Sequence, residues 1–158
     1  MLVQVLLAVH PEVFTAGAAF AGVPFAGFAT EAGSWNEECA QGRLIRSPRE
    51  WGDLVRSAFP GHGGPWPRIQ LWHSITDDII AHQNLVEAVK QWTDVHQVPS
   101  SSARVDRPRP QWQRSRFGSA GKPPVVEAIN VSGSPHNVLS AGMAGHTLAF
   151  FGLADPFS

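Results

Sequence analysis

The chain has 158 residues, of which 43% are hydrophobic and 16% are charged, and its formal net charge is -1 at pH 7. This length fits one compact domain, and the apolar content suffices for a core, which excludes a largely disordered chain. The basic residues form no long run, so nucleic acid is not an expected partner. No apolar run reaches the roughly 20 residues that span a bilayer, so we expect no membrane partner.

The first part of the chain predicts a helix, a strand and a loop. Residues 2–9 are apolar apart from Gln4 and predict a helix that ends at Pro11. They lack the basic start of a secretory signal peptide, so we do not interpret them as one. Small apolar residues over 15–22 predict a short buried strand packed closely by helices. Residues 24–46 show no periodicity and predict a long loop.

A second helix has a strong start signal. Ser47 can cap it, Pro48 suits its first position, and Glu50 can bond back to the cap. We expect this helix to end at Pro60. After a turn-rich segment, residues 68–73 predict a strand.

The next helix is predicted over 84–95, with Asn84 as its cap and Glu87 three residues further on. Residues 99–124 are rich in Pro, Ser and Arg and predict a long surface excursion, with a short strand at 112–117.

The end of the chain predicts a further strand at 125–131 and a last helix at 140–151, which ends at Gly152. Strands that alternate with helices predict an α/β fold with a mostly parallel sheet flanked by helices. Three main strands make a small sheet with open edges, so the pattern indicates part of a domain. Because an exposed edge strand pairs readily with other chains, we expect association through it.

Candidate catalytic residues lie in two loops that follow predicted strands. Residues 74–78 contain Asp77 and Asp78, and residues 132–137 contain His136. In α/β sheets, active groups lie on loops beyond the carboxyl ends of strands. An acid after one strand and a histidine after a later strand follow the chain order of a Ser…Asp…His triad.

Other polar side chains have simpler interpretations. His73 ends a strand and is expected to brace the acid loop, while His146 lies inside the last helix, where it packs or faces solvent. The other histidines lack ligand spacing, so no metal site is predicted. Asn130 begins a glycosylation sequence but falls in a predicted strand. Trp112 is interpreted as a loop anchor, with a place at the border of a substrate cleft as the alternative.

Short motifs in order along nearly the whole chain carry a family resemblance. They lie at 10–14 (His-Pro-Glu-Val-Phe), 16–18 (Ala-Gly-Ala), 51–56 (Trp-Gly-Asp-Leu-Val-Arg), 64–69 (Gly-Pro-Trp-Pro-Arg-Ile), 71–77 (Leu-Trp-His-Ser-Ile-Thr-Asp), 89–95 (Val-Lys-Gln-Trp-Thr-Asp-Val), 126–129 (Val-Glu-Ala-Ile), 135–137 (Pro-His-Asn), 142–144 (Gly-Met-Ala) and 150–153 (Phe-Phe-Gly-Leu). With these motifs the chain resembles the esterase family that includes polyhydroxybutyrate depolymerases and related feruloyl and acetylxylan esterases.

The resemblance implies the roles of two residues. Asp77 closes a Trp-His-Gly-x-x-Asp stretch and takes the place of the catalytic acid, although Ser74 stands where the family usually has Gly. His136 takes the place of the family histidine, in a loop before the last helix. The histidine would take the serine proton and return it to the leaving alkoxide, while the acid would hold the ring tautomer. Asp78 adjoins Asp77, and the motif favours Asp77.

The nucleophile departs from the family pattern. The Gly-x-Ser-x-Gly elbow is expected just before the first helix, and so before the chain begins. Ser119 and Ser140 lie in sequences that resemble an elbow only in part. We therefore expect residues 1–158 to be the C-terminal portion of an α/β-hydrolase domain, with the N-terminal half and its serine absent.

On this resemblance the full-length protein is a serine-type carboxylic ester hydrolase that needs no cofactor. Its substrate would be a polyester, or an acetyl or feruloyl ester of a polysaccharide, and the sequence does not decide among them. The alternative is an inactive fragment with at most a binding role. Family members are commonly secreted, so we expect the same of the parent protein. The single cysteine, Cys39, would then pair outside this chain.

Overall fold

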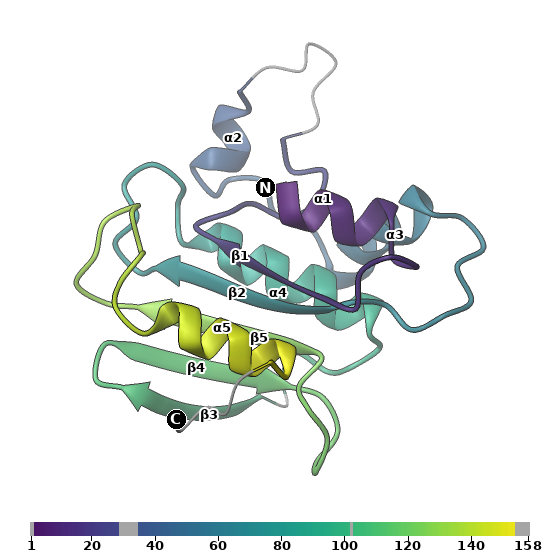
Figure 1. Ribbon diagram of the computed structural model, residues 1–158. Helices are drawn as coiled ribbons and strands as arrows, with labels where there is room; N and C mark the ends of the chain where they lie inside the picture. Colours follow the sequence, from purple (N-terminus) through teal and green to yellow (C-terminus); the bar gives the residue numbers. More distant parts are fainter. Residues whose placement is uncertain (1, 29–34, 102, 154–158) are drawn as a thin grey trace.

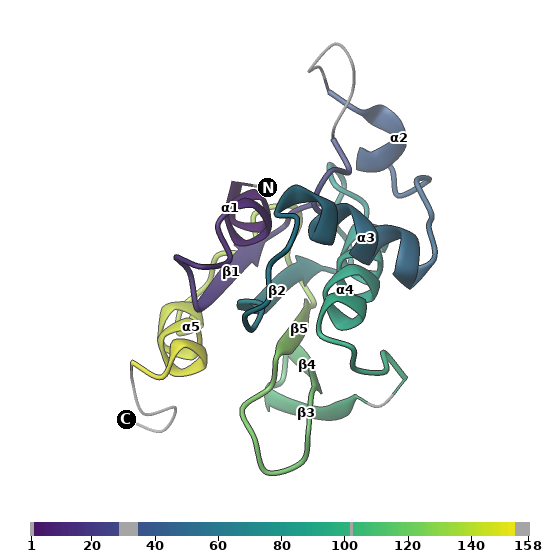
Figure 2. The same cartoon turned by 90° about the vertical axis from the view of Figure 1, so that its right-hand side faces the viewer.

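The computed structural model describes residues 2–28, 35–101 and 103–153. In chain order, its helices and strands are α1 (Leu2–Val9), β1 (Ala16–Phe20), α2 (Glu37–Ala40), α3 (Pro48–Ala58), β2 (Arg68–Ser74), α4 (Gln83–Val95), β3 (Arg104–Arg109), β4 (Trp112–Phe117), β5 (Val126–Val131) and α5 (Met143–Phe151). The strands form one twisted sheet, with α1, α3 and α4 on one side and α5 on the other (Figures 1 and 2).

The sheet has the strand order β1-β2-β5-β4-β3. β1, β2 and β5 are parallel, whereas β4 is antiparallel to both of its neighbours, so the sheet is mixed. The expected α/β class is confirmed, since strands alternate with helices through the parallel part. The short strand expected at 112–117 is confirmed as β4, whereas the predicted surface excursion over 99–124 is wrong where β3 forms. β3 and β4 form a hairpin that extends the sheet.

The hairpin is hard to recognise in the sequence because charged side chains stand where strands usually carry apolar ones. Asp106 on β3 accepts hydrogen bonds from Arg114 Nε (2.8 Å, to Oδ1) and from Arg116 Nη2 (2.8 Å, to Oδ2) on β4. In β4 only the two end residues, Trp112 and Phe117, are buried. These ion pairs form only once the two strands are side by side, so no local apolar pattern indicates them.

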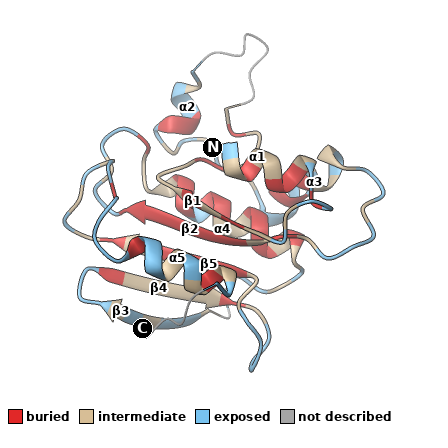
Figure 3. Cartoon of the chain, in the orientation of Figure 1, coloured by how far each residue is buried: buried red, intermediate tan, exposed pale blue. Residues whose placement is uncertain are grey.

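β2 lies at the centre of the core, and all its residues from Ile69 to Ser74 are buried (Figure 3). On one face, Leu71 packs in a cluster with Trp92 of α4. On the opposite face, Trp72 packs in a second cluster with Met143 of α5. A strand that is buried on both faces between parallel neighbours is typical of an α/β sheet.

β1 is packed closely by α1, as its small residues predict. A Cβ atom added to Gly17 would lie 2.8 Å from Cγ1 of Val3 and 2.9 Å from Cδ1 of Leu7 on α1. A larger residue there would require the Val3 and Leu7 side chains to shift. Within the described residues, β1 has a strand neighbour on one side only.

The start of α3 confirms the predicted capping box. The Ser47 hydroxyl accepts from the Glu50 backbone N–H, and the Glu50 carboxylate accepts from the Ser47 N–H (2.8 Å). The predicted loop over 24–46 contains the short helix α2, and its residues 29–34 lie outside the described part of the chain.

The predicted cap of α4 is wrong. The helix begins at Gln83, and the Asn84 side chain instead donates to the carbonyl oxygens of Cys39 (2.8 Å) and Ala40 (3.2 Å), which ties α2 to α4. The Cys39 thiol packs beside it, with Sγ 3.4 Å from Asn84 Oδ1. Burial raises the pKa of this thiol to about 11, so it stays protonated at neutral pH.

Glu87 also differs from its predicted role, because its carboxylate is buried between α3 and α4. It accepts hydrogen bonds from Trp51 Nε1, Gln83 Nε2 and Lys90 Nζ, each at 2.7 Å, and from the Arg46 N–H at 3.2 Å. Burial alone would raise the pKa of this carboxyl, but the hydrogen bonds hold it below its usual value. Glu87 thus joins α3, α4 and the segment before α3.

We predict that Glu87→Ala lowers the free energy of unfolding by about 3 kcal/mol, because it leaves the buried Trp51 donor and the half-buried Gln83 donor unpaired and Lys90 without its carboxylate. Glu38→Ala, at an exposed position, should change it by no more than about 0.5 kcal/mol. Urea unfolding followed by tryptophan fluorescence measures both values. Equal stabilities of the two variants would contradict the role given to Glu87.

Candidate active site

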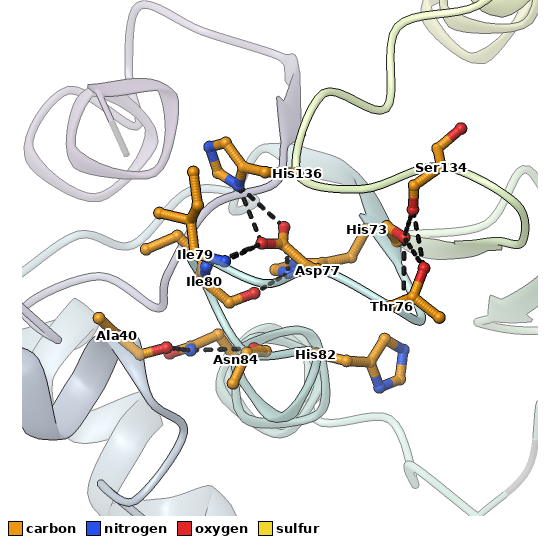
Figure 4. Close-up of polar contacts among 12 residues, drawn as sticks. Ala40, His73, Thr76, Asp77, Ile79, Ile80, His82, Asn84, Ser134 and His136 are labelled. Carbon is orange, nitrogen blue, oxygen red and sulfur yellow. Dashed lines mark hydrogen bonds and ion pairs between the residues drawn. The ribbon is translucent and has the colours of Figure 1, made fainter.

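Two loops meet at the carboxyl ends of the neighbouring parallel strands β2 and β5. The parallel pairing extends beyond the strands, because the Ile75 N–H donates to the Val131 carbonyl (3.0 Å). The loop after β2 carries Asp77, and the loop after β5 carries His136, so the two side chains approach each other at one rim of the sheet (Figure 4). The topology therefore brings together residues that are 59 positions apart in the sequence.

Asp77 and His136 are in hydrogen-bond contact. Nδ1 of His136 lies 3.0 Å from Oδ1 and 2.9 Å from Oδ2 of Asp77. The Asp77 side chain is fully buried, whereas the His136 side chain is 36% exposed. The neighbouring Asp78 is exposed. The carboxylate that touches the histidine is thus the one that the sequence motif favours.

The backbone of its own loop orients the Asp77 carboxylate. Oδ1 accepts hydrogen bonds from the N–H groups of Ile79 (3.0 Å) and Ile80 (2.8 Å). A buried carboxylate is stable only when hydrogen bonds replace its lost hydration. The short turn after Asp77 supplies two such donors and fixes the direction in which the carboxylate meets His136.

His73 braces this loop from below, as the sequence predicts. Its ring is buried at the end of β2, with Nε2 2.8 Å from the Ile80 carbonyl oxygen and 3.3 Å from Oδ2 of Asp77. Burial lowers the pKa of His73 below its usual value of 6.5, and the contacts with Ile80 and Asp77 only partly oppose this effect. A neutral ring with its proton on Nε2 donates to the Ile80 carbonyl.

Two hydroxyl groups connect the loop that carries His136 (residues 132–137, the histidine loop) to the loop that carries Asp77 (residues 74–78, the acid loop). The carbonyl oxygen of Ser134 accepts from the hydroxyl of Ser74. It also accepts from Oγ1 of Thr76 (2.9 Å; Figure 4). Ser134 lies two residues before His136. The serine at the position where the resembled family usually has Gly therefore connects the two loops. Sequence reasoning did not assign it a role, and its departure from the motif was the available signal.

The structure places the other singled-out residues away from this contact. His146 packs edge-on against Trp112, with ring centroids 5.0 Å apart, and Trp112 itself is buried. Asn130 is half-buried, and its Oδ1 lies 2.6 Å from Nε2 of His82. This contact supports the interpretation that the glycosylation sequence at Asn130 occurs by chance.

The described residues offer neither a metal-binding cluster nor a membrane-spanning helix. They contain no group of three or more His, Cys, Asp or Glu side chains that could hold a metal ion. None of the helices in residues 2–28, 35–101 and 103–153 is both long and apolar enough to cross a bilayer.

We predict that at about pH 6 the His73 ring is protonated to a smaller extent than an ordinary histidine, because burial lowers its pKa. The unfolded chain binds that proton at its usual pKa, so the free energy of unfolding should fall as the pH drops below 6.5. Nitrogen NMR of the imidazole and urea unfolding at several pH values test both effects. In His73→Gln, which keeps a donor for the Ile80 carbonyl, the decrease should be smaller. A His73 ring that is protonated at pH 6 to the same extent as an ordinary histidine would contradict the prediction.

The chain is similar in sequence to known esterases. No model of a protein family matches the chain. The chain is 37% identical over 157 residues to an acetylxylan esterase of Coprinopsis cinerea, a match that covers 97% of this chain and 41% of that protein. It is 32% identical over 142 residues to feruloyl esterase B of Talaromyces stipitatus, which covers 87% of this chain and 39% of the relative.

A solved structure agrees with the strand arrangement. The acetyl xylan esterase from Aspergillus awamori superposes with a TM-score of 0.87 at 28% identity, over 98% of this chain and 56% of that one. The chain thus spans about two fifths of the length of the curated relatives it matches. The comparisons support the acetylxylan and feruloyl esterase part of the resemblance. The chain is a homologue of these esterases, and its sheet and helices have the arrangement of an α/β-hydrolase.

Proposed function

We propose that Asp77 and His136 are the acid and the base of a Ser-His-Asp triad in a carboxylic ester hydrolase. The observation that carries this proposal is the hydrogen bond between a fully buried carboxylate and a partly exposed imidazole, at 2.9 Å. The contact lies at the carboxyl ends of parallel strands, where α/β folds hold their active groups. The homologues named as esterases support the same chemistry.

The geometry fits the work of a general base. When the Nδ1–H group of His136 donates a hydrogen bond to Asp77, Nε2 carries a lone pair and can accept a proton from a serine hydroxyl. The serine oxygen then attacks the ester carbonyl, and the imidazolium is stabilised by the carboxylate. The proton passes to the departing alkoxide, and water releases the acyl group in a second round of the same steps. No cofactor takes part in this cycle.

We infer that the nucleophilic serine comes from a segment outside this chain. Within the described residues, Nε2 of His136 has no hydrogen-bond partner, and the exposed Ser119 and Ser140 make no hydrogen bond with it. A further strand added in parallel to the free edge of β1 would end at the same rim as Asp77 and His136. A serine at the end of that strand would then face the base.

The surface beside β1 suits such a strand. A mainly apolar cavity of about 310 Å³ lies between α1, β1 and α5, and its lining includes Leu6, Phe14, Phe20 and Phe151. Apolar surface next to unpaired strand edges favours burial by another segment. We therefore propose that the chain forms part of a larger α/β-hydrolase domain.

The substrate class follows from the homologues. We propose that the complete protein acts on acyl esters of polysaccharides, such as acetyl or feruloyl esters of xylan, because the relatives bear these names. A polymeric plant substrate lies outside the cell, so the proposal includes secretion of the complete protein.

We predict that the 158-residue chain alone hydrolyses p-nitrophenyl acetate no faster than buffer does. The coding sequence before Met1 should encode Gly-x-Ser-x-Gly in the same frame, and the longer polypeptide should be active. In that polypeptide, His136→Ala and Asp77→Asn should each lower kcat about 10,000-fold. The exposed Asp78→Asn is the matched control and should keep its activity.

Two results would contradict this proposal. One is hydrolysis by the 158-residue chain that His136→Ala abolishes, which would place the nucleophile inside it. The other is a stop codon close before Met1, which would favour the inactive alternative.

We also predict that the 158-residue chain self-associates through β1. Thr15 and Ala21 hydrogen-bond to β2, so strand alternation directs the N–H of Ala18 toward the free edge. Ala18→Pro removes that donor without removing a bond to β2, and it should shift the chain toward monomer in sedimentation velocity. β3 is an unsuitable edge, since its Arg-Val-Asp-Arg-Pro-Arg sequence carries four charges and a proline. A wild-type monomer that unfolds cooperatively would contradict this prediction.

A further inference from the structure

A second hollow opens on the same rim of the sheet as the proposed triad. Its volume is about 450 Å³, and it lies between the β3–β4 turn, the histidine loop and the segment before α5. Its polar lining comes from Arg109, Gln111, Ser132, Ser134 and Ser140. The buried Trp112 forms part of its floor.

The antiparallel hairpin explains why this hollow lies beside the base. β4 begins where β5 ends, with Trp112 paired to Val131, so the turn between β3 and β4 reaches the carboxyl rim of the parallel strands. The Ser132 N–H donates to the Gln111 carbonyl (2.9 Å), which joins the turn to the histidine loop. Ser134 lines the hollow and lies two residues before His136. A group bound in the hollow therefore lies beside the loop that carries His136.

Arg109 is held in place on the wall of this hollow. Its guanidinium lies over the Trp112 ring, 4.7 Å from the centroid, and Nη1 donates to the Ala141 carbonyl (2.9 Å). It also packs against Gly142, whose φ of 86° favours glycine and where any Cβ would collide with the guanidinium. Because a guanidinium has five N–H donors, it keeps donors for a ligand after these contacts. Such preorganisation reduces the entropy lost on binding.

The lining is suited to a neutral, hydroxyl-rich ligand. Hydroxyl and amide groups can both donate to and accept from sugar hydroxyls, and the guanidinium can donate to them. An aromatic acyl group would find no open ring to stack on. Trp112 is only 2% exposed, is covered by Arg109 and meets Trp72 and His146 edge-on.

The structure assigns this hollow to the sugar portion of the ester substrate, with Arg109 and Gln111 as binding residues. This inference rests on the proposed function, and it deepens it by placing the polysaccharide on the hairpin side of His136. The acyl group then lies on the other side of the reacting carbonyl.

The test is the binding of an unacylated β-1,4-xylo-oligosaccharide, xylotetraose, to the 158-residue chain by saturation-transfer NMR, which requires neither a serine nor turnover. Arg109→Ala should weaken the affinity about tenfold, because it removes a charge-assisted donor. Gln111→Ala should weaken it about threefold, for the loss of a neutral hydrogen bond that is partly replaced by water. Arg107→Ala, an exposed arginine on the same strand that does not line the hollow, is the matched control and should bind like the parent.

Arg109→Ala also removes the hydrogen bond to the Ala141 carbonyl, which can change the segment before α5. Gln111→Ala is the second variant because it leaves that segment intact. The Gln111 side chain is exposed and makes no hydrogen bond within the described residues, and its backbone contact with Ser132 remains in the variant. Free ferulate serves as an acyl-group probe, and neither substitution should reduce its binding.

Three results would overturn the inference. These are no binding of xylotetraose, unchanged affinity in both variants, or a loss of ferulate binding instead. None of them would affect the proposed triad, because hydrolysis of p-nitrophenyl acetate tests it with an alcohol that contains no sugar.

Discussion

A buried carboxylate that must find hydrogen-bond partners determines how this part of the molecule is built. Asp77 is fully enclosed, and an isolated ion at such a depth would cost several kcal/mol. The N–H groups of Ile79 and Ile80 and the ring of His136 replace its hydration. The histidine can reach it only because β2 and β5 are parallel neighbours, whose following loops leave the same edge of the sheet. The proposed catalytic contact and the sheet topology therefore depend on each other.

Further contacts keep the two loops together around this pair. His73 supports the turn after Asp77, and the hydroxyls of Ser74 and Thr76 hold the Ser134 carbonyl in the histidine loop. The β3–β4 hairpin adds a third element to the same rim and contributes a polar hollow beside the loop that carries His136. In the proposed enzyme, the parallel strands would supply the reacting groups and the antiparallel strands would supply the binding surface.

Features set by residues that are close in the sequence were predicted correctly. The structure differs from the predictions where contacts between distant residues determine the conformation. The α3 capping box and the glycine end of α5 are readable because their residues interact within a few positions. The Asp77–His136 pair is predictable because strand order and a family motif agree. β4 is predicted, but its partner β3 is missed because the charges of Asp106 and Arg114 are balanced only across the two paired strands. Asn84 resembles a helix cap, yet its amide binds carbonyls 44 and 45 positions away.

Proton NMR of the 15N-histidine-labelled 158-residue chain tests the hydrogen bond between Asp77 and His136 most directly. We predict a strongly deshielded proton attached to Nδ1 of His136, absent from both Asp77→Asn and His136→Gln and retained in Asp78→Asn. A His136 ring with its proton on Nε2, or a spectrum that Asp77→Asn leaves unchanged, would contradict this hydrogen bond.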